Sequence, residues 1–281
     1  MSYDDYLAGD PVIVTAALTG GVHGKESAPQ IPETPAEIGE AAGAAVDAGA
    51  SIVHVHARQD NGERSFATER FQAIDEAIRA NTDDVIIQHS TGGTGVPAEV
   101  RAQPLRTDPA PETASLDMGP LNRYDRLTSE NTRATVDALY DEMADRGIKP
   151  EMELFNDGHI NETHQFLDRR DLAEPAYATL IFGPGTLTRA RPRNFINAID
   201  NLPEGMAFNT LGFGPHQLPL TTMGIIMGGH VRVGLEDNVY FRRGEPAESS
   251  AQLVERTAGI AETLGRPVAT PDQARGILNL D

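Results

Sequence analysis

Two histidines and one glutamate are the residues of this chain whose types and spacing best suit metal chemistry. His54 and His56 stand one residue apart in a short β-branched run, residues 51–57, bounded by Gly49 and by a turn-forming segment. Side chains on a strand alternate between its two faces, so both imidazoles point the same way. With Glu236 as a third ligand, a fourth tetrahedral position stays open for water or substrate, which is typical of a catalytic zinc site rather than a structural one.

Arg232 and Asp237 flank this glutamate and are candidates for proton transfer. Arg232 shares a strand face with Glu236, and Asp237 falls just past the end of the strand. The sequence allows two interpretations: Arg232 could hold Asp237 ionised, or the two side chains could form a purely structural salt bridge.

A glycine-rich turn, residues 90–95, follows another apolar run. Its backbone N–H groups and hydroxyls suit a carboxylate, a phosphate or an oxyanion. The turn lacks the GxxxxGK[ST] and GxGxxG nucleotide-binding patterns. His89 precedes Ser90 and should point to the opposite face, where we expect it to pack or to form an interface.

Three further acids lie on strand positions. Glu151 and Glu153 share a strand face, so they are either inward carboxylates that support the site or part of a solvated strand entrance. Asp117 follows the run 113–116 and is a candidate for substrate contact.

The elements that must position these residues alternate between short apolar runs and helical patterns. Helix starts are indicated at Thr34 and Thr270, where a threonine cap precedes proline and an acid or amide follows at the third helical position. Eight strands and the chain length predict a (β/α)₈ TIM barrel over residues 1–281 as one domain, with C-terminal helices packed on it, and a doubly wound sheet is the alternative fold. The candidate strands are residues 12–17, 52–57, 85–90, 113–116, 152–155, 178–182, 207–211 and 231–235.

The composition restricts the function further. The 281 residues contain no cysteine, so a metal must use nitrogen and oxygen ligands. A net charge of −19 disfavours nucleic acid and anionic membrane surfaces as partners. The chain has no opening apolar run of signal-peptide or membrane-span length, so we expect a cytoplasmic protein. The spread of acids, with only Lys25 and Lys149 as lysines, favours a salt-loaded, halophilic cytoplasm over an ordinary acidic protein.

Ordered segments along nearly the whole chain resemble the β-keto acid cleavage enzymes. The strongest is Gly-Gly-His-Val-Arg-Val-Gly-Leu-Glu-Asp-Asn at residues 228–238. This many motifs in the same order are specific to that family. The other matching segments are residues 15–20, 54–58, 88–93, 150–153, 251–254, 265–267 and 269–271.

The resemblance implies a TIM barrel, usually a homotetramer, that holds zinc or a similar divalent ion through His54, His56 and Glu236. It also implies a retro-Claisen reaction, in which a β-keto acid and acetyl-CoA give acetoacetate and a new CoA thioester. The family's serine in the glycine-rich turn matches Ser90, and its hydroxyl after strand four matches Ser115.

The resemblance and the residues together suggest roles for the remaining side chains. Asp237, oriented by Arg232 and relayed through Ser90, is expected to remove the α-proton of the keto acid. Ser90, Ser115 and the glycine amides are expected to hold its carboxylate. The candidate substrate-binding residues are Val22, Gly92, Gly93, Ser115, Asp117 and Glu153.

One position departs from the amine-cleaving member of the family. Where that enzyme has an acid for the substrate ammonium, this chain has Val22, followed by His23. An unpaired buried cation would cost several kcal/mol, so we expect a non-cationic keto acid.

Other classes fit the sequence less well. Amidohydrolases also use an HxH pair in a barrel, but on the first strand and often with a carbamylated lysine, whereas this pair lies on the second strand. A class II aldolase would share zinc-enolate chemistry. A barrel that binds a metal or serves assembly without turnover is the alternative outside enzymes.

Overall fold

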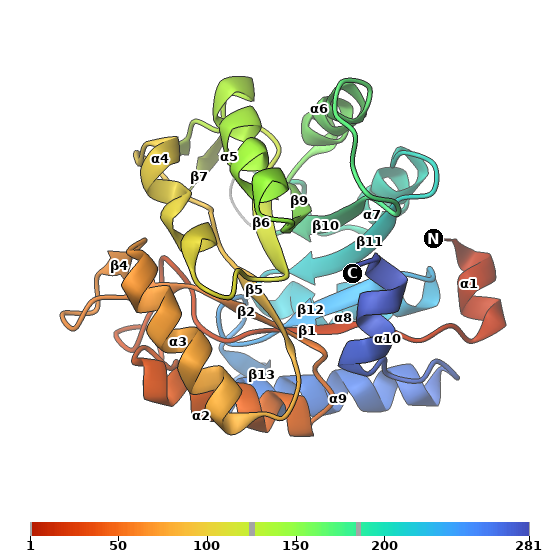
Figure 1. Ribbon diagram of the computed structural model, residues 1–281. Coiled ribbons are helices and arrows are strands. Elements are labelled where there is room, and N and C mark those ends of the chain that lie inside the picture. The colour runs from red at the N-terminus through yellow and green to blue at the C-terminus, as the bar shows by residue number, and fades with distance from the viewer. Residues whose placement is uncertain (1, 124–126, 184–186, 281) are drawn as a thin grey trace.

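The computed structural model describes residues 2–123, 127–183 and 187–280. Within these ranges eight parallel strands close into a barrel, which confirms the predicted TIM barrel and excludes the doubly wound sheet (Figure 1). The barrel order is β1-β12-β11-β10-β9-β6-β5-β2. The strands are β1 (Val14–Ala17), β2 (Ile52–Val55), β5 (Ile86–His89), β6 (Thr113–Asp117), β9 (Lys149–Leu154), β10 (Tyr177–Phe182), β11 (Ala207–Gly212) and β12 (His230–Val233).

Helices connect successive barrel strands and cover the outside of the barrel. Both predicted capping boxes are present, with Thr34 starting α2 and Thr270 starting α10. The helices are α1 (Tyr3–Ala8), α2 (Pro35–Asp47), α3 (Thr68–Asn81), α4 (Ala98–Arg101), α5 (Arg133–Asp145), α6 (Asp157–Leu167), α7 (Pro192–Asp200), α8 (Gln217–Ile226), α9 (Ser250–Thr263) and α10 (Pro271–Leu278), with 3₁₀ turns η1 (Gln103–Arg106) and η2 (Gly214–His216).

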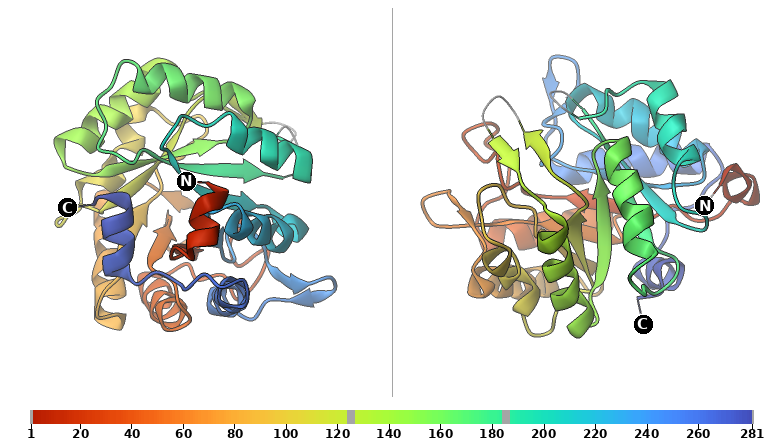
Figure 2. Two further views of the ribbon diagram at one scale, coloured as in Figure 1. Left: turned by 90° about the vertical axis from the view of Figure 1, so that its right-hand side faces the viewer. Right: turned by 90° about the horizontal axis from the view of Figure 1, so that it is seen from above.

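The two ends of the barrel differ. Helix α10 packs Ala274 and Leu278 against residues at the starts of the strands, including Ile52 and Ile86, and so covers the amino-terminal end. Three short hairpins follow barrel strands: β3 (Ala57–Arg58) with β4 (Arg64–Ser65), β7 (Leu121–Arg123) with β8 (Leu127–Ser129), and β13 (Tyr240–Arg242) with β14 (Glu245–Pro246). Figure 2 shows α10 and the β13–β14 hairpin at opposite ends of the molecule. The hairpins therefore mark the carboxyl-terminal mouth, where TIM-barrel chemistry occurs.

The second barrel strand is shorter than the predicted run. It ends at Val55, and Ala57 pairs with Ser65 in the antiparallel hairpin β3–β4. The hairpin returns through a turn in which Gly62 has φ 81°, a conformation that glycine adopts without strain. His56 consequently lies at the junction between barrel and hairpin.

Among the described residues, no helix is both long and apolar enough to span a bilayer.

Candidate metal centre and its surroundings

Strand β1 lies between β2, which carries His54 and ends just before His56, and β12, which ends shortly before Glu236. Ala17 is in register with His54 of β2, and the backbone N–H of Glu236 donates to the carbonyl of Ala17 at 3.3 Å. Two glycines permit this close approach. A Cβ at Gly20 would lie 2.9 Å from Cγ of Glu236, and a Cβ at Gly234, which has φ 147°, would lie 2.1 Å from the carbonyl oxygen of Ala17. Residues from the two ends of the chain thus meet at the end of β1.

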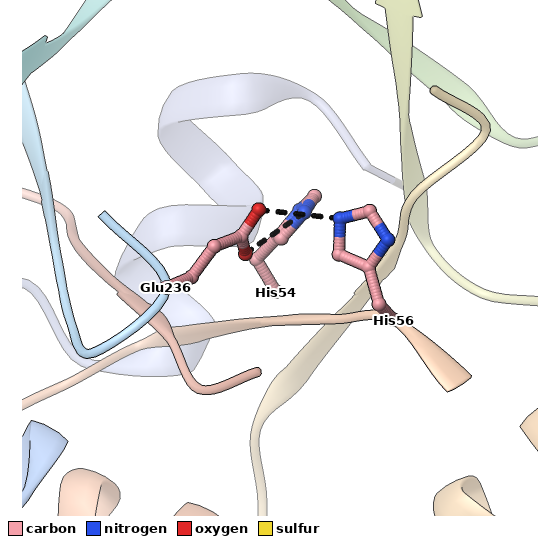
Figure 3. A group of neighbouring side chains, drawn as sticks. All are labelled: His54, His56 and Glu236. Atoms are coloured by element: carbon pink, nitrogen blue, oxygen red, sulfur yellow. Dashed lines mark ion pairs between the residues drawn. The ribbon is translucent and has the colours of Figure 1, made fainter. Parts of the chain in front are cut away.

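The three predicted ligands converge on one point (Figure 3). His54 Nε2 lies 3.6 Å from Glu236 Oε2, and His56 Nε2 lies 3.2 Å from Glu236 Oε1. One ligand atom from each of the three residues lies within 4.8 Å of the others. Both imidazoles are buried, and the glutamate side chain is 14% exposed. The prediction that these residues gather around one point is confirmed.

The protonation states suit a cation. Burial, reinforced by the Arg232 guanidinium, holds the pKa of His54 well below its usual range. Burial lowers the pKa of His56 to about 4, against the opposing effect of Glu236. Burial alone would raise the pKa of Glu236, but Arg232 and the two imidazoles outweigh it and the net pKa is lowered. Two neutral imidazoles and one carboxylate are the form in which these side chains bind a metal.

An orphaned oxygen also fits a metal ion. Glu236 Oε2 is buried and, within the described part of the chain, accepts no hydrogen bond. Buried carboxylate oxygens are seldom left in this state, because desolvation without a partner is costly. An ion between this oxygen and the imidazole Nε2 atoms would satisfy it.

Arg232 and Asp237 form the predicted pair. Arg232 Nε and Nη2 donate to Asp237 Oδ2 and Oδ1 at 2.9 and 3.0 Å, a bidentate geometry that fixes the carboxylate plane. Arg232 Nη2 also lies 3.1 Å from Glu236 Oε1, so one guanidinium serves a candidate ligand and a candidate base. Burial raises the pKa of Asp237 to about 6, although Arg232 opposes this shift.

Glu151 and Glu153 both point into the barrel and are buried, so the solvated-entrance alternative was wrong. The Glu151 carboxylate accepts hydrogen bonds from the side chains of Gln88 and Thr179. Burial, and then the neighbouring Asp117 carboxylate, raise the pKa of Glu153 well above its usual range. A side-chain hydrogen bond joins Glu153 and Asp117, and such a bond between two carboxyl groups requires a proton on one of them.

The glycine-rich turn lies over a buried polar network. The amide of Gly92 donates to Ser90 Oγ at 3.3 Å, and the amide of Thr91 donates to Ser115 Oγ at 3.1 Å. These two amides already have acceptors inside the protein. Below them, Arg101 Nε donates to the Thr91 carbonyl at 2.7 Å.

Arg101 also explains one glycine of the turn. A Cβ at Gly93 would lie 2.9 Å from Cδ of Arg101, so a larger residue there would displace the arginine. Arg101 Nη1 donates to Asn131 Oδ1 at 2.8 Å, and Asn131 Nδ2 donates to Asp117 Oδ2 at 3.0 Å. The turn and the buried Asp117 are thereby held in fixed relation.

Four residues of the site were not found from the sequence: Gln88, Arg64, Arg101 and Asn131. Gln88 carried a usable signal, because it precedes Ser90 by two residues and so shares its inward strand face. The others reach the site from a hairpin, a short helix and a loop. His89 was correctly expected to pack, since it contacts Asp75 at 2.7 Å on the outer face.

A TIM barrel with a buried His-His-Glu cluster at its mouth defines the class of this protein. Residues 11–280 match the family model described as beta-keto acid cleavage enzyme, and the chain belongs to that family of acetyl-CoA-dependent cleavage enzymes and transferases. This confirms the resemblance read from the sequence.

Named relatives match along nearly their full length. The 3-keto-5-aminohexanoate cleavage enzyme of Fusobacterium nucleatum is 40% identical over 272 residues, which cover 96% of this chain and 98% of that enzyme. The 3-oxoadipate:acetyl-CoA acetyltransferase of Cupriavidus necator is 33% identical over 276 residues, 96% and 95% of the two chains.

Solved structures agree on the fold. The apo structure of ObcA superposes with a TM-score of 0.78 at 21% identity and covers 89% of this chain and 66% of that chain. A type I 3-dehydroquinate dehydratase from Clostridium difficile gives a TM-score of 0.56 at 10% identity, covering 92% and 93%.

Proposed function

We propose that this protein converts a non-cationic β-keto acid and acetyl-CoA into acetoacetate and a new acyl-CoA, with a divalent metal bound by His54, His56 and Glu236. The observation that carries this proposal is the Arg232–Asp237 pair, which shares its guanidinium with the candidate ligand Glu236. A rigid carboxylate beside a metal site is what proton removal next to a polarised carbonyl requires.

The residues divide the reaction into binding and proton transfer. The hydroxyls of Ser90 and Ser115, each of which accepts from an amide of the glycine-rich turn, donate to the substrate carboxylate. A divalent ion, when bound, polarises the 3-keto oxygen as a Lewis acid. Asp237, oriented by Arg232, takes the α-proton, and Arg232 offsets the negative charge that develops.

The bond changes balance without an oxidant or a covalent enzyme intermediate. The deprotonated α-carbon attacks the thioester carbonyl of acetyl-CoA and expels the CoA thiolate. The thiolate then attacks the 3-keto carbon, the C2–C3 bond breaks, and acetoacetate regains the proton from Asp237. The remaining acyl group leaves as the CoA thioester.

Several finer features belong to the same proposal. The ligand set of two imidazoles and a carboxylate supports zinc or a similar divalent ion. The family resemblance supports a homotetramer. The net charge of −19 supports a surface adapted to high salt.

The proposal is tested with metal-loaded protein in high salt. Acetyl-CoA is supplied with cationic, neutral and anionic β-keto acids, and acetoacetate and new CoA thioesters are measured by mass spectrometry. Turnover of a neutral or anionic acid supports the reaction and names the acyl group. Absence of turnover for every acid, with metal bound, overturns it.

A further inference from the structure

Arg64 places a positive charge directly beside the candidate metal centre. It lies on β4, where the hairpin pairs it with Arg58. Its Nη2 lies 3.1 Å from Nδ1 of His56 and donates to the carbonyl of Gly92. A Cβ on Gly21 would lie 2.7 Å from Cζ of Arg64. The guanidinium therefore touches a metal ligand, the glycine-rich turn and the loop after β1.

The other arginine of this hairpin has a structural role. Arg58 Nη2 donates to the carbonyls of Gly20 and His23 at 2.6 Å each, and its Nη1 donates to the carbonyl of Gly62 at 2.7 Å. These bonds tie the loop after β1 to the hairpin. They also hold the backbone around Gly21 against which the guanidinium of Arg64 lies.

The residue after Gly21, in the loop that Arg64 contacts, contributes to the charge on this side of the barrel mouth. Val22 follows Gly21, and its side chain is 46% exposed and uncharged. Arg64 places a cation beside Gly21, the neighbouring residue of this loop. A guanidinium beside an uncharged side chain favours an anion over an ammonium at this place.

The contact with His56 gives a second reason to expect an anion here. A guanidinium only donates, so Arg64 uses the lone pair on Nδ1 of His56. A histidine that binds a metal through Nε2 carries its proton on Nδ1 and no longer accepts there. With metal bound, Nδ1 of His56 and Nη2 of Arg64 would both donate toward this place, where an anion accepts from both, and Arg64 keeps its bond to the Gly92 carbonyl.

We propose that Arg64 binds a second carboxylate of the substrate, so that this protein prefers β-keto acids with an anionic group beyond the keto carbon. The inference rests on the proposed function and specifies its substrate class. The planar guanidinium suits bidentate binding of a carboxylate. A hydrogen bond to a charged group supports a preference of about 10- to 100-fold over a neutral acid of equal length.

The test compares kcat/KM for 3-oxoadipate and for 3-oxohexanoate, which has the same length but lacks the second carboxylate. The wild type should prefer 3-oxoadipate by at least about 10-fold. Arg64→Gln should bring the ratio close to one, and Arg64→Lys should retain part of it. The matched control is Arg70→Gln on α3, which removes an exposed arginine paired with Asp60 and should leave the ratio unchanged. A wild-type preference for 3-oxohexanoate, or an unchanged ratio in Arg64→Gln, overturns the inference.

Two further measurements separate this role from others. Competition with a chelator gives the zinc affinity of Arg64→Gln. An affinity within about threefold of the wild type shows that the ratio of kcat/KM values changed without loss of the metal site. Loss of zinc binding would instead assign Arg64 a structural role. Calorimetry with adipate and hexanoate needs no turnover, and adipate should bind at least about 10-fold more tightly to the wild type. Failure of all turnover with retained adipate selectivity would reject the proposed reaction but keep the anion site.

Discussion

Nδ1 of His54 donates a hydrogen bond to Oε1 of Gln88 at 2.7 Å, and this contact sets the tautomer of a candidate metal ligand. The amide orientation follows from its other end, where Gln88 Nε2 donates to Thr113 Oγ1 at 2.8 Å and to the Glu151 carboxylate. The proton of His54 therefore lies on Nδ1. Its Nε2 lone pair is left facing Glu236.

Removing this support should weaken metal binding without removing a ligand. In Gln88→Leu, His54 loses its acceptor and Glu151 loses a donor, so we expect the zinc dissociation constant to rise about 10- to 100-fold. Chelator competition measures it. Gln72→Leu, which changes a glutamine on the outer helix α3, is the matched control and should bind zinc normally. Equal affinities in the two variants would contradict the role given to Gln88.

Asp237→Asn should abolish most turnover while the protein still binds metal. Asparagine keeps the shape of the side chain but cannot take a proton, and general-base catalysis typically contributes about 10²- to 10⁴-fold. We expect kcat to decrease by a factor within that range. Zinc content and unfolding temperature are measured as controls. A variant that retained most of its activity would show that another group is the base.

The parts of the site that depend on strand periodicity were predictable. Alternation along a strand places His54 and His56 on one face, and the spacing of Arg232 and Asp237 permits the pair that forms. The count of eight strands followed from apolar runs, because strands buried on both faces are nearly continuous in hydrophobicity. The predicted ends were within a few residues of the observed ones.

The parts that depend on contacts between distant segments were not predictable. Nothing in the local sequence indicates that Arg64 reaches His56 across a hairpin, or that Glu153 shares a hydrogen bond with Asp117 of the neighbouring strand. The hairpin itself was missed because residues 52–57 continue one apolar pattern. Only the pairing of Ala57 with Ser65 reveals that the strand has ended.

His230 should make stability depend on acid pH. It is buried, and its Nδ1 accepts from the backbone N–H of Ile13 at 3.1 Å. Burial, then the charge of Arg266, lower its pKa to about 3. The unfolded chain takes up this proton near pH 6.5 and the folded chain does not until about pH 3. The free energy of unfolding therefore falls as the pH drops through this window, by at most about 1.4 kcal/mol per pH unit.

His230→Asn offers the measurement for this site. The Asn oxygen can accept from Ile13 but does not titrate, so urea unfolding between pH 4 and 6 should show a shallower slope than the wild type. The slope is compared rather than the absolute stability, because the smaller side chain also leaves a cavity. Identical slopes would mean that His230 takes up its proton in the folded protein as readily as in the unfolded one.

Salt should stabilise the folded chain by screening repulsion among its acids. The Debye length falls from about 10 Å at 0.1 M to about 3 Å at 1 M, and the net charge is −19. We expect the free energy of unfolding to rise by about 3 kcal/mol, or Tm by roughly 6–12 °C for a chain of this size.

The triple variant Glu40→Gln, Asp83→Asn, Glu255→Gln removes three exposed charges. It should melt at a higher temperature than the wild type at 0.1 M KCl and respond less to added salt. Sucrose, which favours compact states without screening, is the control. A Tm that stays flat between 0.1 and 1 M KCl would show that the acids do not destabilise the fold, because screening then has no repulsion to relieve.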